Sequence, residues 1–193
     1  MNKLKIVAFG DSLTVGYQSP TMENPYYLET PYIDFLAEKT ENKFNFIMKG
    51  ISGEMTEEML RRFDEDVISF KPNYVIILGG TNDIGWGIAI DETADNLFAM
   101  YDLAIKANII PIAVTIPSIR GFDELIHPRV ILNNMIIEHC KSKNILYIDL
   151  FKASSKPVTL QLEGKYANDG LHLSTAGYKL IADLLYNEVF GKI

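Results

Sequence analysis

The chain has 193 residues, of which 48% are hydrophobic and 22% are charged, a composition typical of globular proteins that excludes intrinsic disorder. The formal net charge of −7 lacks the basic footprint that nucleic acid or an anionic membrane surface requires in a main partner. Because a domain commonly holds roughly 150 residues, the length favours one domain over residues 1–193.

The N-terminal residues and the cysteine content predict a cytoplasmic protein. The apolar run of residues 6–9 is too short for a signal peptide, and no small-residue cleavage site follows it. No stretch approaches the roughly 18 consecutive apolar residues of a membrane span. The single cysteine, Cys140, cannot form an intramolecular disulfide, which fits a reducing compartment. The sequence leaves the oligomeric state open.

Short apolar runs alternate with amphipathic stretches along the whole chain. The runs are rich in Ile, Val, Phe and Tyr and are bounded by Gly, Asn, Pro or Asp, as buried strands are. The expected elements in chain order are a strand at 6–9, a helix from Pro31 with Thr30 as N-cap, a strand at 44–48, a helix at 55–67, a strand at 74–78, a helix at 94–105, a strand at 109–115, a helix at 130–140, a strand at 145–150 and a helix after Ser174 as N-cap. This alternation predicts an α/β fold with a parallel sheet covered on both faces.

Three longer stretches, residues 18–29, 117–128 and 152–168, are expected to be loops. In an open α/β sheet, ligands bind outside the carboxyl ends of the strands. Residues that directly follow a strand are therefore the candidates for chemistry.

A hydroxyl follows the first strand, and a histidine with a nearby carboxylate lies in the loop before the last helix. Ser12 follows the first strand within Gly10-Asp11-Ser12, and Asp169 and His172 lie three residues apart before the last helix. The loop can fold back so that the carboxylate of Asp169 meets the imidazole ring and holds its tautomer. Taken singly, each has a plain structural alternative: a helix cap for Ser12 and a solvated loop for His172.

Two candidate hydrogen-bond donors follow the second and third strands. Gly53, in Gly50-Ile51-Ser52-Gly53, could present a bare backbone N–H at the start of a helix. Asn82, in Gly79-Gly80-Thr81-Asn82-Asp83, could donate from its side chain into the same space. Ordinary turn chemistry is the alternative for both. Together, the four clusters supply a nucleophile, a base, its orienting carboxylate and donors for an oxyanion.

The order and surroundings of these four clusters resemble the SGNH family, also called the GDSL family of esterases and lipases, from Ile6 to about Val189. The resemblance implies a flavodoxin-like three-layer α/β/α sandwich with a five-stranded parallel sheet. It implies Ser12 as nucleophile, His172 as general base and Asp169 as the residue that orients it. The implied oxyanion hole consists of the Ser12 and Gly53 backbone N–H groups and the Asn82 side chain. Leu173 stands where many relatives have Pro.

The expected activity is hydrolysis of carboxylic esters of small or medium acyl groups, through an acyl-enzyme and without cofactor or metal. Candidate substrates are simple esters, thioesters, lysophospholipids and acetylated sugars, and activity should fall as His172 becomes protonated. Tyr17 and Trp86 follow two of the clusters and could line the substrate pocket. Acyl transfer by the same serine chemistry and an inactive binding module are the alternatives.

The sequence does not indicate a nucleotide-binding site, a metal site or the serine site of other hydrolases. The lipase elbow G-x-S-x-G, the Walker A motif and the dinucleotide fingerprint are missing. His127 and His139 have no metal-ligand spacing and are expected at the surface or in packing. Cys140 lies among apolar residues, so we expect a buried, inert thiol.

Overall fold

A computed structural model describes residues 3–193 and contains a five-stranded parallel sheet with the strand order β4-β1-β5-β6-β7. Its strands are β1 (Lys5–Gly10), β4 (Asn45–Gly50), β5 (Tyr74–Leu78), β6 (Ile110–Val114) and β7 (Leu146–Ile148). Each strand overlaps one of the five predicted runs, with small shifts at the ends. Renumbered along the chain, the order is 2-1-3-4-5, which is the flavodoxin-like order.

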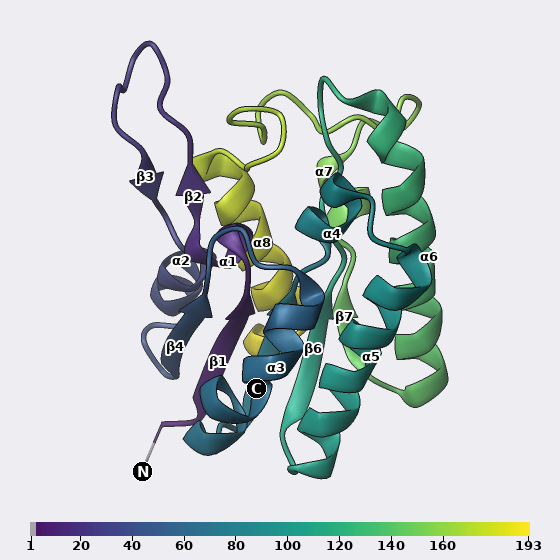
Figure 1. The fold of residues 1–193 in the computed structure, drawn as a ribbon. Helices are drawn as coiled ribbons and strands as arrows, with labels where there is room; N and C mark the ends of the chain where they lie inside the picture. Colours follow the sequence, from purple (N-terminus) through teal and green to yellow (C-terminus); the bar gives the residue numbers. More distant parts are fainter. Residues whose placement is uncertain (1–2) are drawn as a thin grey trace.

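Helices cover both faces of this sheet (Figure 1). One face carries α3 (Thr56–Asp66), α5 (Ile90–Lys106) and α6 (Ile126–Lys143), which pack in that order, and the other carries α2 (Tyr32–Lys39) against α8 (Thr175–Glu188). The predicted three-layer α/β/α sandwich is therefore confirmed. None of the helices within residues 3–193 has both the length and the hydrophobicity needed to cross a bilayer.

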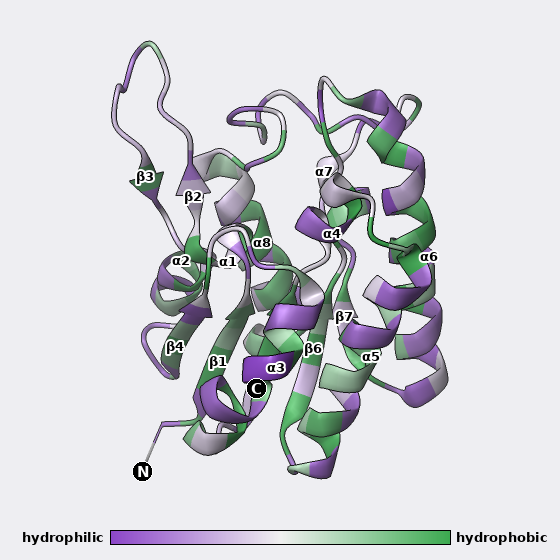
Figure 2. Ribbon diagram, viewed as in Figure 1, coloured by the Kyte–Doolittle hydropathy of each residue, from purple (hydrophilic) through white to green (hydrophobic). Residues whose placement is uncertain are grey.

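The core forms because apolar side chains from the strands meet apolar stripes of the helices. Ile6–Phe9 and Val75–Leu78 are buried completely, as is the stripe of Met59, Phe63 and Val67 at helical spacing. The rings of Phe9 and Phe63 meet edge to face at 5.3 Å. Full burial of such a side chain stabilises the fold by about 1.5–3 kcal/mol. Figure 2 shows the strands of the sheet mostly in hydrophobic colours, and hydrophilic colours alternating with hydrophobic ones along α5.

Short elements that the sequence pattern did not predict lie at the carboxyl end of the sheet. They are α1 (Ser12–Val15) after β1, the hairpin strands β2 (Tyr17–Gln18) and β3 (Leu28–Glu29), α4 (Thr81–Trp86) after β5, and α7 (Leu150–Ser154) after β7. Three 3₁₀ turns complete the chain, at Ile68–Phe70, Asp123–Leu125 and Phe190–Lys192. The loops gather above the sheet in Figure 1, while the C-terminus lies toward the opposite, amino end of the strands. The carboxyl end of the sheet thus carries one cluster of loops and short elements.

Three helices begin at other residues than the sequence pattern predicted, and one of them is α5, which begins at Ile90 rather than at Ala94. Pro31 is the N-cap of α2 and has an extended conformation (ψ 133°), so the helix begins at Tyr32 and Thr30 does not cap it. The Thr30 hydroxyl instead accepts a hydrogen bond from Gln18 Nε2 at 2.8 Å, within the hairpin. The fourth helix begins at Ile126 and not at Val130, because proline is tolerated in the first turn of a helix. The N-cap predicted at Ser174 is confirmed, with its hydroxyl accepting from the Gly177 N–H.

Candidate active site

Ser12 is the first residue of α1, directly after β1, and is 6% exposed. The carboxylate of Asp11 caps this short helix by accepting a hydrogen bond from the Leu13 N–H at 2.9 Å. As the first helical residue, Ser12 has a backbone N–H without a partner inside the helix. A Cβ atom on Gly10 would lie 2.1 Å from the Leu78 carbonyl oxygen, so the tight strand end requires glycine there.

His172 connects Ser12 to Asp169. Its Nε2 lies 3.2 Å from Ser12 Oγ, and its Nδ1 lies 2.7 Å from Asp169 Oδ2. The other carboxylate oxygen, Asp169 Oδ1, accepts hydrogen bonds from the backbone N–H groups of Leu171 at 2.9 Å and His172 at 2.7 Å. The loop therefore folds back on itself in the manner expected from its spacing. Gly170 permits this turn with φ +97°, where a Cβ atom would lie 2.3 Å from the Arg120 carbonyl oxygen.

Ser19 is a second partner of Asp169 that the sequence analysis missed. Its hydroxyl donates to Asp169 Oδ2 at 2.5 Å, and its backbone N–H donates to Asn168 Oδ1 at 2.6 Å. Burial alone would raise the pKa of the Asp169 carboxyl, but the hydrogen bonds from His172 and Ser19 outweigh it and hold that pKa well below its usual range. The carboxylate facing the imidazole is therefore ionised. No local signal marks Ser19, because the contact depends on how the hairpin packs against a distant loop.

Asn82 lies in the first turn of α4, and its amide faces the loop that contains Gly53. Its Nδ2 donates to the Glu54 carbonyl oxygen at 2.8 Å, which leaves the second N–H of the amide available. Gly53 is exposed, adopts φ +86°, and has no atom within 4 Å of the position of a Cβ. The structure thus brings the Gly53 loop to Asn82, as the two candidate donors require.

Arg62 ties this loop to the end of β1. Its Nε donates to Glu54 Oε1 at 2.7 Å, and its Nη2 donates to the Gly10 carbonyl oxygen at 3.2 Å. Its guanidinium also lies 4.2 Å from the centroid of the Phe9 ring. One side chain therefore connects the loop containing Gly53 with the strand that leads to Ser12, a link that sequence spacing does not reveal.

Asp83 fixes α4 relative to the start of α3. The carboxylate is 1% exposed and accepts hydrogen bonds from the Thr56 N–H at 3.1 Å and from the Thr56 hydroxyl at 2.6 Å. Burial raises the pKa of Asp83 in spite of these bonds. The neighbour of Asn82 thereby anchors the turn from which Asn82 projects.

The structure places Tyr17 against His172, and Trp86 on a cavity that Asn82 also lines. The ring of Tyr17 meets the His172 ring edge to face at 4.7 Å and stacks on Tyr27 at 6.0 Å. Trp86 is 78% exposed and lines a cavity of about 290 Å³. The other lining residues are mostly apolar and include Asn82; in full they are Thr81, Asn82, Gly85, Ile119, Phe122, Leu125, Arg129 and Leu171.

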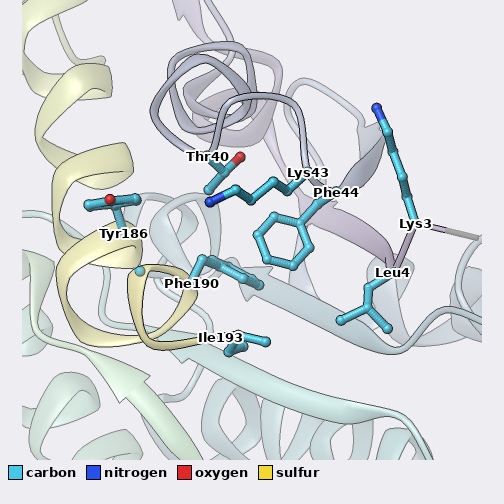
Figure 3. Close-up of a pocket in the computed structure, with 9 residues that line it drawn as sticks. Lys3, Leu4, Thr40, Lys43, Phe44, Tyr186, Phe190 and Ile193 are labelled. Carbon is cyan, nitrogen blue, oxygen red and sulfur yellow. The ribbon is translucent and has the colours of Figure 1, made fainter. Parts of the chain in front are cut away.

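A second cavity, of about 300 Å³, lies at the opposite, amino end of the sheet, beside the chain ends (Figure 3). Lys3, Lys43, Phe44 and Phe190 line it, and none of the candidate catalytic residues does. It therefore has no part in the chemistry of Ser12.

Among the described residues we find neither a cluster suited to bind a metal nor a reactive thiol at this site. The part of the chain that the structure describes holds no cluster of three or more His, Cys, Asp or Glu side chains arranged for a metal. Cys140 is buried completely, and burial raises the pKa of its thiol to about 12. His127 is exposed and His139 stacks on Phe98 at 3.8 Å, the surface and packing roles expected of them.

Two known proteins are similar to this chain in sequence. The acetylxylan esterase of Geobacillus stearothermophilus is 24% identical over 96% of this chain and 93% of its own length. The lipoprotein YqeF of Bacillus subtilis is 31% identical over 60% of this chain, a match that spans only half of YqeF.

Solved structures match over nearly the whole chain. A lipase/acylhydrolase from Enterococcus faecalis is 27% identical and covers 98% of this chain and 96% of its own, with a TM-score of 0.80. A GDSL-like lipase from Bacteroides thetaiotaomicron, 23% identical, shares the fold with a TM-score of 0.81 over 98% of this chain and 89% of its own. The sequence profile of the GDSL-like lipase/acylhydrolase family matches residues 8–180. The chain therefore belongs to the GDSL-like lipase/acylhydrolase family and is a carboxylic ester hydrolase, as the four sequence clusters predicted.

Proposed function

We propose that Ser12, His172 and Asp169 form a catalytic triad that hydrolyses short-chain carboxylic esters. The observation that carries the proposal is the continuous path from Ser12 Oγ to His172 Nε2 at 3.2 Å and from His172 Nδ1 to Asp169 Oδ2 at 2.7 Å. A nucleophile in reach of a base, with the base held by a third group, is the arrangement that activates a hydroxyl.

The reaction has two steps. His172 Nε2 takes the proton of Ser12 while Ser12 Oγ forms a bond to the ester carbonyl carbon. The tetrahedral intermediate collapses as the ester C–O bond breaks, and His172 gives its proton to the departing alcohol. Water then adds to the acyl-enzyme with His172 again as base, and the acid leaves as Ser12 regains its proton. Ionised Asp169 stabilises the imidazolium in both steps.

Three donors are assigned to the oxyanion: the backbone N–H groups of Ser12 and Gly53 and the side chain of Asn82. The support for Asn82 is that only one of its two amide hydrogens is used, by the Glu54 carbonyl oxygen. The support for Gly53 is the open space around its Cα and the contact of its loop with Asn82. Donors placed in advance stabilise developing charge without reorganisation in the transition state.

O-acetylated carbohydrates are the first substrate class that we propose. The acetylxylan esterase relative covers nearly the whole chain. Large exposed aromatic side chains lie in the loop of the hairpin, at the end of α4 and after β6, namely Tyr26, Tyr27, Trp86 and Phe122. Rings with an apolar face and, in tyrosine and tryptophan, a polar tip suit the mixed surface of a sugar. Tyr27 stacks on Tyr17, which contacts His172, so this surface extends to the proposed base.

A fluorophosphonate probe and an ester panel test the assignment. The unmodified protein and Ser142→Ala, which lacks an exposed serine of α6, should both be labelled covalently, whereas Ser12→Ala should not be. Labelling of Ser12→Ala at the same rate would remove Ser12 as nucleophile, and failure to label the unmodified protein would favour an inactive binding module.

The ester panel should contain acetylated xylo-oligosaccharides and 4-nitrophenyl acetate, butyrate and octanoate. We expect acetate to be released from the oligosaccharides and kcat/KM to fall with chain length. A maximum at octanoate without acetate release would contradict the carbohydrate assignment. Adding a second alcohol separates hydrolysis from acyl transfer, because transfer produces the new ester.

A further inference from the structure

The guanidinium of Arg129, on α6, is buried without a full set of partners. The residue is 1% exposed, and its Nη1 donates to Thr81 Oγ1 at 3.3 Å and to the Pro117 carbonyl oxygen at 3.2 Å. Its Nε and Nη2 have no hydrogen-bond acceptor among residues 3–193. Three of its five N–H groups therefore lack a partner, since Nε carries one hydrogen and Nη2 two.

No carboxylate of the described chain forms an ion pair with Arg129. Asp11 is the acidic group whose charge acts on it, yet Asp11 Oδ2 itself has no hydrogen-bond partner, so the two side chains do not bond. Burial lowers the pKa of Arg129 to about 10, which leaves the group charged at neutral pH. A buried charge without a bonded counter-charge is unfavourable, and a ligand that supplies one is bound strongly in return.

Arg129 borders the cavity of about 290 Å³ that Trp86 also lines. Two further lining residues belong to the proposed reaction centre: Asn82 is an oxyanion donor, and Leu171 precedes His172. The remaining walls are largely apolar. A cavity with apolar walls and a single cation beside the reacting carbonyl suits a short organic chain that ends in a carboxylate.

We propose that Arg129 is a specificity-determining residue that binds a carboxylate group of the ester substrate. The carboxylate belongs either to the acyl part, as in a half-ester of a dicarboxylic acid, or to the alcohol part, as in an acetylated hydroxy acid or sugar acid. The proposal names the substrate class of the same site and rests on the proposed esterase function for its kinetic readout.

Two matched substrate pairs test it with the unmodified protein. Ethyl hydrogen succinate against ethyl succinamate places the charge on the acyl side, and 4-acetoxybenzoate against 4-acetoxybenzamide places it on the alcohol side. We expect kcat/KM to favour the acid in one pair by about tenfold or more, as a charged, bidentate hydrogen bond provides. Equal rates, or faster hydrolysis of the amide, in both pairs would overturn the proposal.

Variants identify the residue responsible. Arg129→Met should reduce the acid-to-amide ratio to about one, while Arg129→Lys, which keeps the charge, should retain part of it. Arg61→Met is the matched control, because it removes an exposed arginine of α3, and its ratio should equal that of the unmodified protein. An unchanged ratio in a folded Arg129→Met protein would exclude Arg129.

A binding measurement separates this proposal from the esterase function. Calorimetry on Ser12→Ala should show tighter binding of the acid than of the amide in the preferred pair, whether or not the unmodified protein hydrolyses either. Equal affinities would overturn the role of Arg129 and leave the proposed triad untouched. If Arg129→Met fails to fold, this calorimetric comparison on Ser12→Ala still tests whether the site prefers a carboxylate.

Discussion

Ser19 and Asp169, 150 positions apart in the chain, are joined by a hydrogen bond from the Ser19 hydroxyl to Asp169 Oδ2. The same oxygen faces His172 Nδ1 at 2.7 Å. The base of the hairpin therefore holds the carboxylate that orients the proposed general base. This contact makes Ser19 a positioning residue.

Ser19→Ala should lower kcat about three- to tenfold with little change in KM, because a hydrogen bond to a charged group contributes about 1.5–3 kcal/mol and only part of that reaches the transition state. Steady-state kinetics with 4-nitrophenyl acetate provide the measurement. Ser19→Thr, which keeps the hydroxyl, should recover most of the activity. A change in KM alone would place Ser19 in substrate binding instead.

Asn82→Ala should reduce kcat by about 10²–10³-fold and change KM little, since an oxyanion donor acts mainly in the transition state. The comparison is Asn96→Ala, which removes an amide that donates to Thr56 Oγ1 at 3.2 Å, outside the reaction centre. The measurement is kcat and KM of both variants with the same short-chain ester. Equal losses in the two would remove Asn82 from the oxyanion hole.

Arg62→Met should lower the free energy of unfolding by about 2–3 kcal/mol, because it removes hydrogen bonds to charged groups from a side chain that is only 13% exposed. The adjacent Arg61 is 67% exposed and pairs with Glu57, so Arg61→Met should change stability by less than about 0.5 kcal/mol. Urea unfolding measures the free energy of unfolding of both variants. A reduced kcat in folded Arg62→Met would follow from displacement of the Gly53 loop.

Asp11→Asn should stabilise the protein at neutral pH. Burial raises the pKa of Asp11 from 3.8 to about 7. Between those values the unfolded chain is ionised while the folded one stays protonated, so stability falls as pH rises across this range and levels off above it. A shift of about three units corresponds to at most about 4 kcal/mol, and the lost attraction to Arg129 offsets part of it.

The asparagine keeps the helix cap that Asp11 provides to Leu13. The advantage of Asp11→Asn should therefore be largest near pH 8 and disappear below about pH 4, where the aspartate is protonated in both states. Urea unfolding of both proteins across this range provides the measurement. A gain that is independent of pH would show that the charge of Asp11 is not its cause.

Cys140 should not react with a thiol reagent in the folded protein, because only the thiolate is nucleophilic and burial raises the pKa of this group to about 12. Treatment with 5,5′-dithiobis(2-nitrobenzoate) at pH 8 should leave esterase activity unchanged, and the thiol should react once urea unfolds the chain. Rapid modification under native conditions would contradict the burial of Cys140.

The sequence by itself determined the strands, the covered parallel sheet and the four clusters of candidate catalytic residues. Five apolar runs of strand composition could be buried only in a covered sheet, and a parallel sheet brings the ends of its strands to one edge, so Ser12, Gly53 and Asn82 had to gather there. The spacing of Asp169 and His172 is local and needed no knowledge of the fold. The cytoplasmic location and the single domain stay predictions from composition and length.

Only the tertiary structure decided which distant side chains touch. The bond of Ser19 to Asp169, the link from Arg62 to Gly10 and the unpartnered guanidinium of Arg129 each depend on the packing of loops that no periodic pattern describes. The start of α2 was misplaced for the same reason, because Thr30 bonds to the hairpin rather than to the helix that follows it. Burial and hydrogen bonding between segments far apart in sequence overrode local preference at these positions.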